Sequence, residues 1–143
     1  MDWTRHYATG AGYRYWPNEE LVRFVGARHF DSVLEAGCGN GGNLWFLACH
    51  ATKTVGVDSC RAALDAAELY VVRPQRLVPH DIEVHQADIR QLPFQAATFD
   101  VVVDCMTSQH LPWAEHAALY AEYRRVLKPG GWLWLYHLDC QTE

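Results

Sequence analysis

The chain has 143 residues and a net charge of −5, and half of its residues are apolar. This length and composition predict one domain, residues 1–143, with a hydrophobic core. No apolar run approaches the roughly 18 residues of a membrane span, and no secretory signal is indicated. Without a basic stripe, the chain is not expected to bind nucleic acid. Five cysteines without a C-x-x-C pair predict a reduced, cytoplasmic protein.

Aromatic residues crowd the first part of the chain, where Gly10 and Gly12 allow a bend. We expect residues 1–30 to contain two parts, a lid over a ligand and, after it, a helix. The predicted lid residues are Tyr7, Tyr13, Tyr15 and Trp16. Their rings attract cations, although packing of the same rings on the core is the alternative. The helix is predicted to start at Pro17 and Asn18.

A glycine-rich turn follows the apolar strand expected at residues 32–36, and an acidic residue ends the next strand, at residues 53–58. Glycine lets the backbone approach a ligand closely, and the first turn of the following helix offers unpaired N–H groups. Asp58 lies 21 positions after Gly37. Doubly wound folds place a ribose-binding carboxylate at that spacing, so the pattern predicts a site for a nucleoside-bearing cofactor.

Two cofactors compete for this turn. Gly37, Gly39 and Gly42 match the dinucleotide pattern G-x-G-x-x-G, which makes NAD an alternative. Glu35 disfavours NAD because its carboxylate would face a pyrophosphate, and such like-charge contacts cost several kcal/mol. S-adenosylmethionine has no phosphate and carries an ammonium and a sulfonium, so an acid at the turn favours it.

Strands and helices alternate along the rest of the chain. The expected strands are residues 32–36, 53–58, 82–86, Phe99–Cys105 and 132–138. The expected helices are residues 41–50, 60–73 and 113–127. The fourth strand is almost continuously apolar, which is typical of a buried parallel sheet. The alternation predicts a three-layer α/β sandwich with right-handed crossovers.

Five segments, in order, resemble the class I S-adenosylmethionine-dependent methyltransferases over residues 31–137. They are residues 35–41, the cofactor loop; 55–58, the ribose-binding strand end; 86–94, the adenine-binding segment; 99–104, the fourth strand; and 124–131, the turn into strand five. The resemblance implies that S-adenosylmethionine is the cofactor and S-adenosylhomocysteine the product.

The resemblance also implies which residues hold the cofactor. They are Glu35, Gly37, Cys38, Gly39, Gly41, Asp58, Ser59, Asp88, Ile89 and Asp104. Asp88 would accept a hydrogen bond from the adenine amino group. Ser59 stands where the family commonly has an apolar residue against the adenine face. We therefore expect that packing from Ile89 or Leu92.

The implied fold is a Rossmann-like sandwich with a mostly parallel sheet of strand order 3-2-1-4-5, without strands 6 and 7. Residues 31–143 would form its cofactor-binding core, with strand five at an open edge. By the strand's period of two, Trp132, Trp134 and Tyr136 share one face. Proteins cover, charge or pair a long apolar edge, so we expect a homo-oligomer through it.

The chemistry is predicted between strands one and four, where the strand order reverses. His110 follows strand four and is our candidate general base, with a loop-capping role as the alternative. Histidines and cysteines lack the spacing of a zinc site, so no metal is expected. The predicted function is methyl transfer to a small-molecule acceptor. A protein that binds S-adenosylmethionine but cleaves or senses it is the alternative.

Overall fold

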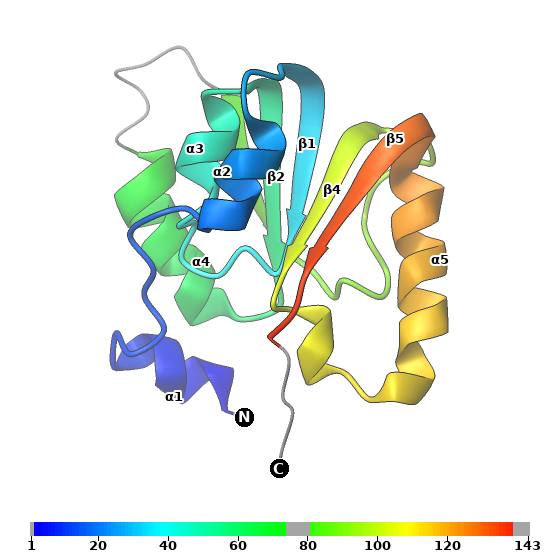
Figure 1. Cartoon of the computed structure of the whole chain (residues 1–143). Coiled ribbons are helices and arrows are strands. Elements are labelled where there is room, and N and C mark those ends of the chain that lie inside the picture. The colour runs from blue at the N-terminus through cyan, green and yellow to red at the C-terminus, as the bar shows by residue number, and fades with distance from the viewer. Residues whose placement is uncertain (1, 74–80, 139–143) are drawn as a thin grey trace.

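The computed structural model describes residues 2–73 and 81–138 (Figure 1). Its five strands are β1 (Phe30–Ala36), β2 (Ala51–Asp58), β3 (Asp81–Gln86), β4 (Phe99–Cys105) and β5 (Leu127–Tyr136). They form one parallel sheet of order β3-β2-β1-β4-β5, which confirms the predicted strand order. The order reverses between β1 and β4, so the loops after these two strands meet at one edge of the sheet.

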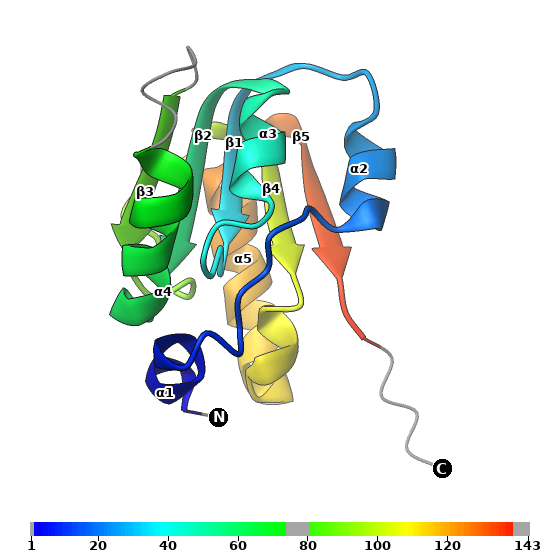
Figure 2. The same ribbon diagram turned by 90° about the vertical axis from the view of Figure 1, so that its left-hand side faces the viewer.

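Helices cover both faces of the sheet, as the alternating pattern predicted. They are α1 (Trp3–Ala8), α2 (Glu19–Val25), α3 (Leu44–Ala48), α4 (Arg61–Ala67) and α5 (His116–Val126), with a π-helical turn at Glu68–Val72 and 3-10 turns at Ser108–His110 and Trp113–Glu115. Figure 2 shows α2, α3 and α4 on one face and α5 on the other. Helix α1 lies off the carboxyl ends of the strands (Figure 1).

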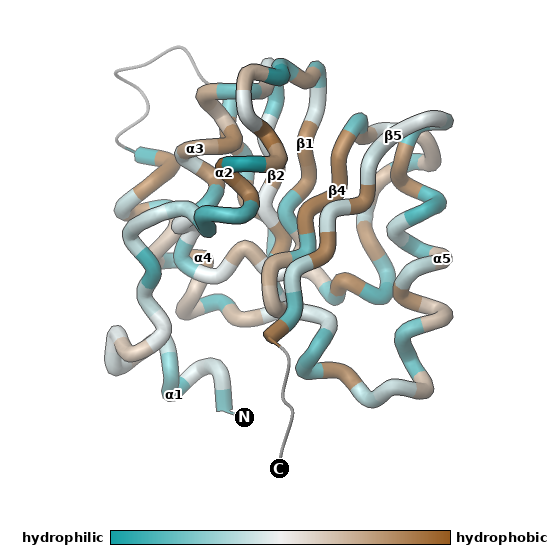
Figure 3. The backbone as a smooth tube through the Cα atoms, viewed as in Figure 1, coloured by the Kyte–Doolittle hydropathy of each residue, from teal (hydrophilic) through white to brown (hydrophobic). Residues whose placement is uncertain are grey.

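The core has two sides because the central strands are buried on both faces. Leu34 and Val102 pack toward α5 with Leu119, whereas Val33 packs toward α2 with Leu21. Strands buried on both faces have near-continuous apolar sequences. Figure 3 accordingly shows hydrophobic residues concentrated along β1 and β4. In the described ranges, no helix is long and apolar enough to cross a membrane.

Two features of the fold differ from the sequence-based expectation. Helix α1 lies in the segment predicted as a bent lid, and the Asp2 carboxylate caps it by accepting from the Arg5 N–H at 3.1 Å. Strand β5 begins at Leu127, five residues earlier than expected, so the last part of the segment 124–131, expected as the turn into this strand, belongs to the strand itself. A register shift in its pairing with β4, together with Gly130 at φ +79°, accommodates that turn sequence.

Strand β5 pairs with β4 on one side and with no other strand in the described ranges. On its aromatic face the Phe24 ring of α2 lies 6.0 Å from Trp132 and 6.5 Å from Trp134, and Trp132 stays 54% exposed. On the opposite face, Leu133 and Leu135 remain exposed. The predicted open, apolar edge is therefore present.

Candidate functional site

A cavity of about 460 Å³ lies against α1 and the loops that follow β1, β2, β3 and β4. It is thus at the edge of the sheet where the strand order reverses, the usual ligand position in doubly wound folds. Its walls include the predicted residues Tyr7, Glu35, Gly37, Cys38, Gly39, Asp58, Ser59, Asp88, Ile89 and His110. The structure therefore brings together residues from segments that are far apart in the sequence.

Glu35, at the end of β1, puts a buried carboxyl group on the cavity wall. Its side chain is 2% exposed, and Oε1 accepts a hydrogen bond from Asn43 Nδ2 at 2.6 Å. Oε2 has no hydrogen-bond partner among the described residues. Burial raises the pKa of Glu35 to about 8. A buried, unpartnered oxygen is costly, so an N–H donor from a ligand would be favourable here.

The glycines of the loop allow a close approach of other segments. Gly37 and Gly39 have positive φ angles of +75° and +55°. A Cβ at Gly37 would overlap the Thr107 side chain, and one at Gly39 would overlap the Tyr7 hydroxyl. Larger residues are therefore excluded at both positions, by backbone conformation and by space.

Gly41 was predicted to contact the cofactor, but it does not line the cavity. A Cβ there would lie 2.9 Å from Val71, so Gly41 serves the packing of the loop against the π-helical turn. Gly42 lines the cavity in its place, and a Cβ at Gly42 would meet the backbone oxygen of Arg14 at 2.9 Å.

Asp58 joins the end of β2 to the glycine loop. Its Oδ2 accepts from the Gly39 N–H at 2.9 Å, and its Oδ1 accepts from the Cys60 N–H at 2.8 Å. Burial raises the pKa of Asp58, although these backbone hydrogen bonds oppose the shift. A carboxylate has about four lone-pair sites, so Asp58 can also accept a hydrogen bond from a hydroxyl group of a ligand.

The segment after β3 supplies the next part of the wall. Asp88 forms an ion pair with Arg90 at 2.5 Å, and hydrogen bonds from Arg90 lower the pKa of the Asp88 carboxyl. Of the two apolar residues proposed to pack on a ligand here, Ile89 lines the cavity. Leu92 instead lies in the core between the sheet and α5.

Asp104 was also predicted to contact the cofactor, but it is fully buried outside the cavity wall. Its Oδ1 accepts from the N–H groups of Thr107 and Ser108 at 3.0 and 3.1 Å. Its Oδ2 accepts from the Tyr123 hydroxyl at 2.9 Å. The chain itself therefore donates three hydrogen bonds to this buried carboxylate, and Asp104 shapes the turn after β4.

Among the four predicted lid residues, Tyr7 lines the cavity. Burial and the nearby Asp58 raise the pKa of the Tyr7 hydroxyl. Tyr13 packs instead between the rings of Tyr7 and Tyr70, at 6.4 and 6.0 Å. Tyr15 and Trp16 are exposed by 69% and 83%, and none of these three residues is on the cavity wall.

Two loop asparagines that the sequence analysis did not assign hold the N-terminal segment. Asn40 pairs with both backbone groups of Arg14, accepting from its N–H at 3.0 Å and donating to its carbonyl at 2.8 Å. Asn43 Oδ1 accepts from the Asn18 N–H at 2.8 Å. We call residues 14–18 the strap. The only local signal was that two asparagines interrupt a glycine loop.

The strap brings a cation to the cavity. The Arg14 side chain lines it, with Nη2 at 3.4 Å from Met106 Sδ. Within the part of the chain that the structure describes, Arg14 forms no ion pair. Its charge is close enough to Glu35 to oppose the rise in the pKa of that carboxyl.

His110 lines the cavity at the end of the 3-10 turn after β4. Its ring packs edge-on against Trp3 at 4.9 Å, which joins this turn to α1. Burial lowers the pKa of His110, which favours the neutral imidazole that can accept a proton. The cavity residues that the sequence analysis did not assign are Trp3, His6, Gly12, Arg14, Asn40, Gly42, Asn43, Arg90, Cys105, Met106, Thr107, Gln109, Leu111 and Leu138.

The fold and this cavity define a doubly wound α/β protein with a ligand site at its switch point. A family model described as a methyltransferase domain matches residues 33–131. The chain therefore belongs to the class I S-adenosylmethionine-dependent methyltransferase family, as predicted. The matched residues begin within β1 and include the glycine loop and the segments after β2, β3 and β4 that line the cavity.

Individual relatives match most of this chain. It is 35% identical over 129 residues to the cypemycin N-terminal methyltransferase of a Streptomyces species, an alignment that covers 87% of this chain and 49% of that protein. The structure of the PH0226 protein from Pyrococcus horikoshii OT3 matches with a TM-score of 0.72 at 30% identity, over 85% of this chain and 51% of that one.

A third match shows the fold alone. Phosphoethanolamine N-methyltransferase 1 of Haemonchus contortus, solved with phosphoethanolamine and S-adenosylhomocysteine, has a TM-score of 0.63 at 15% identity. The alignment covers 92% of this chain and 24% of that one. The chain thus spans about half the length, or less, of these three proteins.

Proposed function

We propose that this chain binds S-adenosylmethionine and transfers its methyl group to a small-molecule acceptor, leaving S-adenosylhomocysteine. The observation that carries the proposal is Glu35, whose buried Oε2 on the cavity wall has no partner in the described part of the chain. An ammonium group would satisfy that oxygen and favour its ionised form. A pyrophosphate carries no N–H donor for that oxygen and would be repelled by the carboxylate once it ionises, which disfavours NAD.

The cavity residues fit the groups of S-adenosylmethionine in the order of the strands. Glu35 would bind the ammonium, and Arg14, which forms no ion pair with any described residue, would bind the carboxylate. Asp58, at the end of the neighbouring strand β2, would accept from the ribose hydroxyls. Asp88 and Ile89, after β3, would hold the adenine by its amino group and its face.

When bound, this cofactor supplies a methyl group on a positively charged sulfur. The residues of the chain then mainly hold the acceptor in line with that group and exclude water. Trp3 and Tyr7 from α1 border the cavity and would cover it. His110, with its lowered pKa, would accept the proton of an O–H or N–H acceptor. Gln109 beside it could orient the acceptor.

Calorimetry with S-adenosylmethionine, S-adenosylhomocysteine and NAD tests the cofactor. We expect Glu35→Gln to weaken S-adenosylhomocysteine binding by at least tenfold. Glu83→Gln is the matched control, because Glu83 is a half-exposed acid on β3 that pairs with Lys53 away from the cavity. Preference for NAD, or an unchanged affinity in Glu35→Gln, would overturn the proposal.

Turnover needs a separate test because the acceptor is unidentified. Incubation of the chain with methyl-labelled S-adenosylmethionine and fractions of small metabolites should yield a labelled product, and His110→Ala should slow its formation. Breakdown of the cofactor without any acceptor, to products other than S-adenosylhomocysteine, would instead support a protein that cleaves it.

We also propose that two copies of the chain associate through β5. The exposed Leu133 and Leu135, and the edge of β5 that no described strand pairs, support a second copy there. Sedimentation velocity at micromolar concentration should give a dimer, and Leu133→Lys should give a monomer. A monomeric wild type would contradict this. The free thiols of Cys38, Cys49, Cys60 and Cys105 support a reducing, cytoplasmic location.

A further inference from the structure

We propose that Arg90 is a positioning residue that fixes the Asp88 carboxylate, and that the pair thereby selects a ligand base with an amino group over one with a keto group. This inference rests on the proposed function, because it concerns the base of the bound cofactor. It assigns a role to one further side chain of segment 86–94, in which the sequence analysis gave individual roles to Asp88, Ile89 and Leu92.

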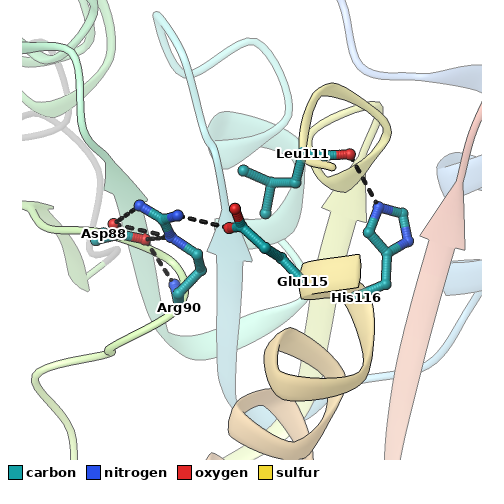
Figure 4. Close-up of polar contacts among 5 residues, drawn as sticks. All are labelled: Asp88, Arg90, Leu111, Glu115 and His116. Atoms are coloured by element: carbon teal, nitrogen blue, oxygen red, sulfur yellow. Dashed lines mark hydrogen bonds and ion pairs between the residues drawn. The ribbon is translucent and has the colours of Figure 1, made fainter. Parts of the chain in front are cut away.

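Arg90 grips Asp88 from several directions (Figure 4). The Asp88 Oδ1 accepts from the backbone N–H of Arg90 at 2.8 Å and from its Nε at 2.9 Å. The Oδ2 accepts from Nε at 3.0 Å and from Nη2 at 2.5 Å. Such a planar, two-point contact fixes the plane of the carboxylate as well as its position.

A second acid holds the other end of the guanidinium. Arg90 Nη1 donates to Glu115 Oε2 at 2.5 Å. This hydrogen bond connects the segment after β3 with the 3-10 turn before α5. That turn is itself anchored, because the ring of the next residue, His116, is buried and its Nε2 lies 3.3 Å from the Leu111 carbonyl oxygen (Figure 4). The backbone at Glu115 is therefore held in place, and its carboxylate holds Nη1 on the side of α5.

The exposure of these groups argues against a stabilising role. The side chains of Arg90 and Asp88 are 46% and 47% exposed. Ion pairs with this exposure contribute little to folding stability, typically less than about 1 kcal/mol. Two acids, Asp88 and Glu115, nevertheless form ion pairs with the same arginine at the wall of the cavity. Positioning explains that arrangement better than stability.

The charge state of the pair determines what it can bind. Arg90 lowers the pKa of the Asp88 carboxyl, so the group is ionised and can only accept hydrogen bonds. An amino group on the ligand base is a matching donor, whereas a keto oxygen would face a carboxylate oxygen. A freely rotating Arg90 could donate to a keto oxygen and reduce this discrimination. Glu115 prevents that rotation by holding Nη1.

The test compares two ligands that differ in the base, S-adenosylhomocysteine and S-inosylhomocysteine, which carries a keto group in place of the amino group. Their Kd values are measured by calorimetry for wild type, Arg90→Lys, which keeps the charge but loses the fork, and Glu115→Gln. Arg61→Lys is the matched control. Arg61 is 50% exposed, pairs with Asp65 on α4 and lies outside the cavity.

We expect wild type to favour S-adenosylhomocysteine by at least tenfold, and both variants to reduce that preference about tenfold. Thermal unfolding of the variants and the preference of Arg61→Lys should remain as in wild type. An unchanged preference in Arg90→Lys and Glu115→Gln would overturn this inference and leave the proposed function standing. Failure of wild type to bind S-adenosylhomocysteine at all would overturn the proposed function itself.

Discussion

The amide of Asn43 donates to Glu35 at 2.6 Å and, through its own oxygen, accepts from the backbone N–H of Asn18 at 2.8 Å. One side chain thus connects the buried carboxyl group on the cavity wall with the strap. Because the other oxygen of Glu35 has no partner in the described ranges, Asn43 alone orients this carboxyl by a hydrogen bond there. A substitution of Glu35 should therefore also alter how Asn43 holds the strap.

The raised pKa of Glu35 predicts how stability depends on pH. In the folded protein this pKa is about 8, above its ordinary value of 4.5. Between pH 5 and 8 the folded form therefore holds a proton that the unfolded form has lost, so the free energy of unfolding falls as pH rises. The slope from this group approaches roughly 1 kcal/mol per pH unit in that window.

Urea unfolding of wild type and Glu35→Gln across this pH range measures that contribution as a difference. The variant, which cannot ionise there, should lose less stability toward pH 8 than wild type. Glu83→Gln is the control, because Lys53 lowers the pKa of Glu83 and keeps it ionised throughout. Parallel pH profiles for wild type and Glu35→Gln would mean that Glu35 is ionised in the folded protein at neutral pH.

The same carboxyl predicts a proton release on ligand binding. At pH 7 Glu35 is protonated in the free protein, since its pKa is about 8. An ammonium group bound to Oε2 favours the ionised form, so binding should release nearly one proton. Calorimetric titration with S-adenosylhomocysteine in buffers of different ionisation enthalpy measures this number. 5′-Methylthioadenosine, which lacks the ammonium, should release none, and equal release by both ligands would remove Glu35 from ammonium binding.

The sheet was predictable because each of its signals is local. Apolar runs that end at Gly37 and Asp58 identify strands without knowledge of their neighbours. Helix α1 was not predictable, since its six residues contain no buried position and hence no apolar period. The start of β5 was missed because Pro129 and Gly130 are typical turn residues. The register shift between β4 and β5 allows them to lie within the strand.

Residues of the cavity wall were predictable only where the end of a strand determines their position. Glu35 and Asp58 follow from their places at the ends of β1 and β2. Their partners do not, because contacts such as Asn40 with Arg14 join segments 26 residues apart and depend on how the strap folds back. Arg90 was missed for a similar reason, since Glu115, its second partner, is 25 residues away.

Asn40 is predicted to hold the strap in place. Asn40→Ala removes both hydrogen bonds to the Arg14 backbone, which should lower the free energy of unfolding by about 2 kcal/mol. Amide hydrogen exchange at residues 14–18 should then accelerate, while that of α5 stays unchanged. Arg14→Ala is the matched control, because it keeps the backbone groups that Asn40 binds. Slow exchange of the strap in Asn40→Ala would show that other contacts hold it.

Substitutions of Asp104 test whether this acid has a structural role, in contrast to the ligand-binding role proposed for Asp58. Asp104→Ala would leave two backbone N–H groups and the Tyr123 hydroxyl without their buried partner, so we expect a loss of about 3 kcal/mol in the free energy of unfolding. Asp104→Asn should cost less, because the hydroxyl can turn and accept from the new amide.

The affinity of these variants for S-adenosylhomocysteine completes the test. Asp104→Asn should bind it as wild type does, because Asp104 lies outside the cavity wall. Asp58→Asn should weaken binding by about tenfold, since an amide group would lose an acceptor for the ribose hydroxyls. If Asp104→Asn lost binding while its unfolding curve matched that of wild type, the sequence-based assignment of Asp104 to the cofactor would be correct and the cavity would extend beyond its present wall.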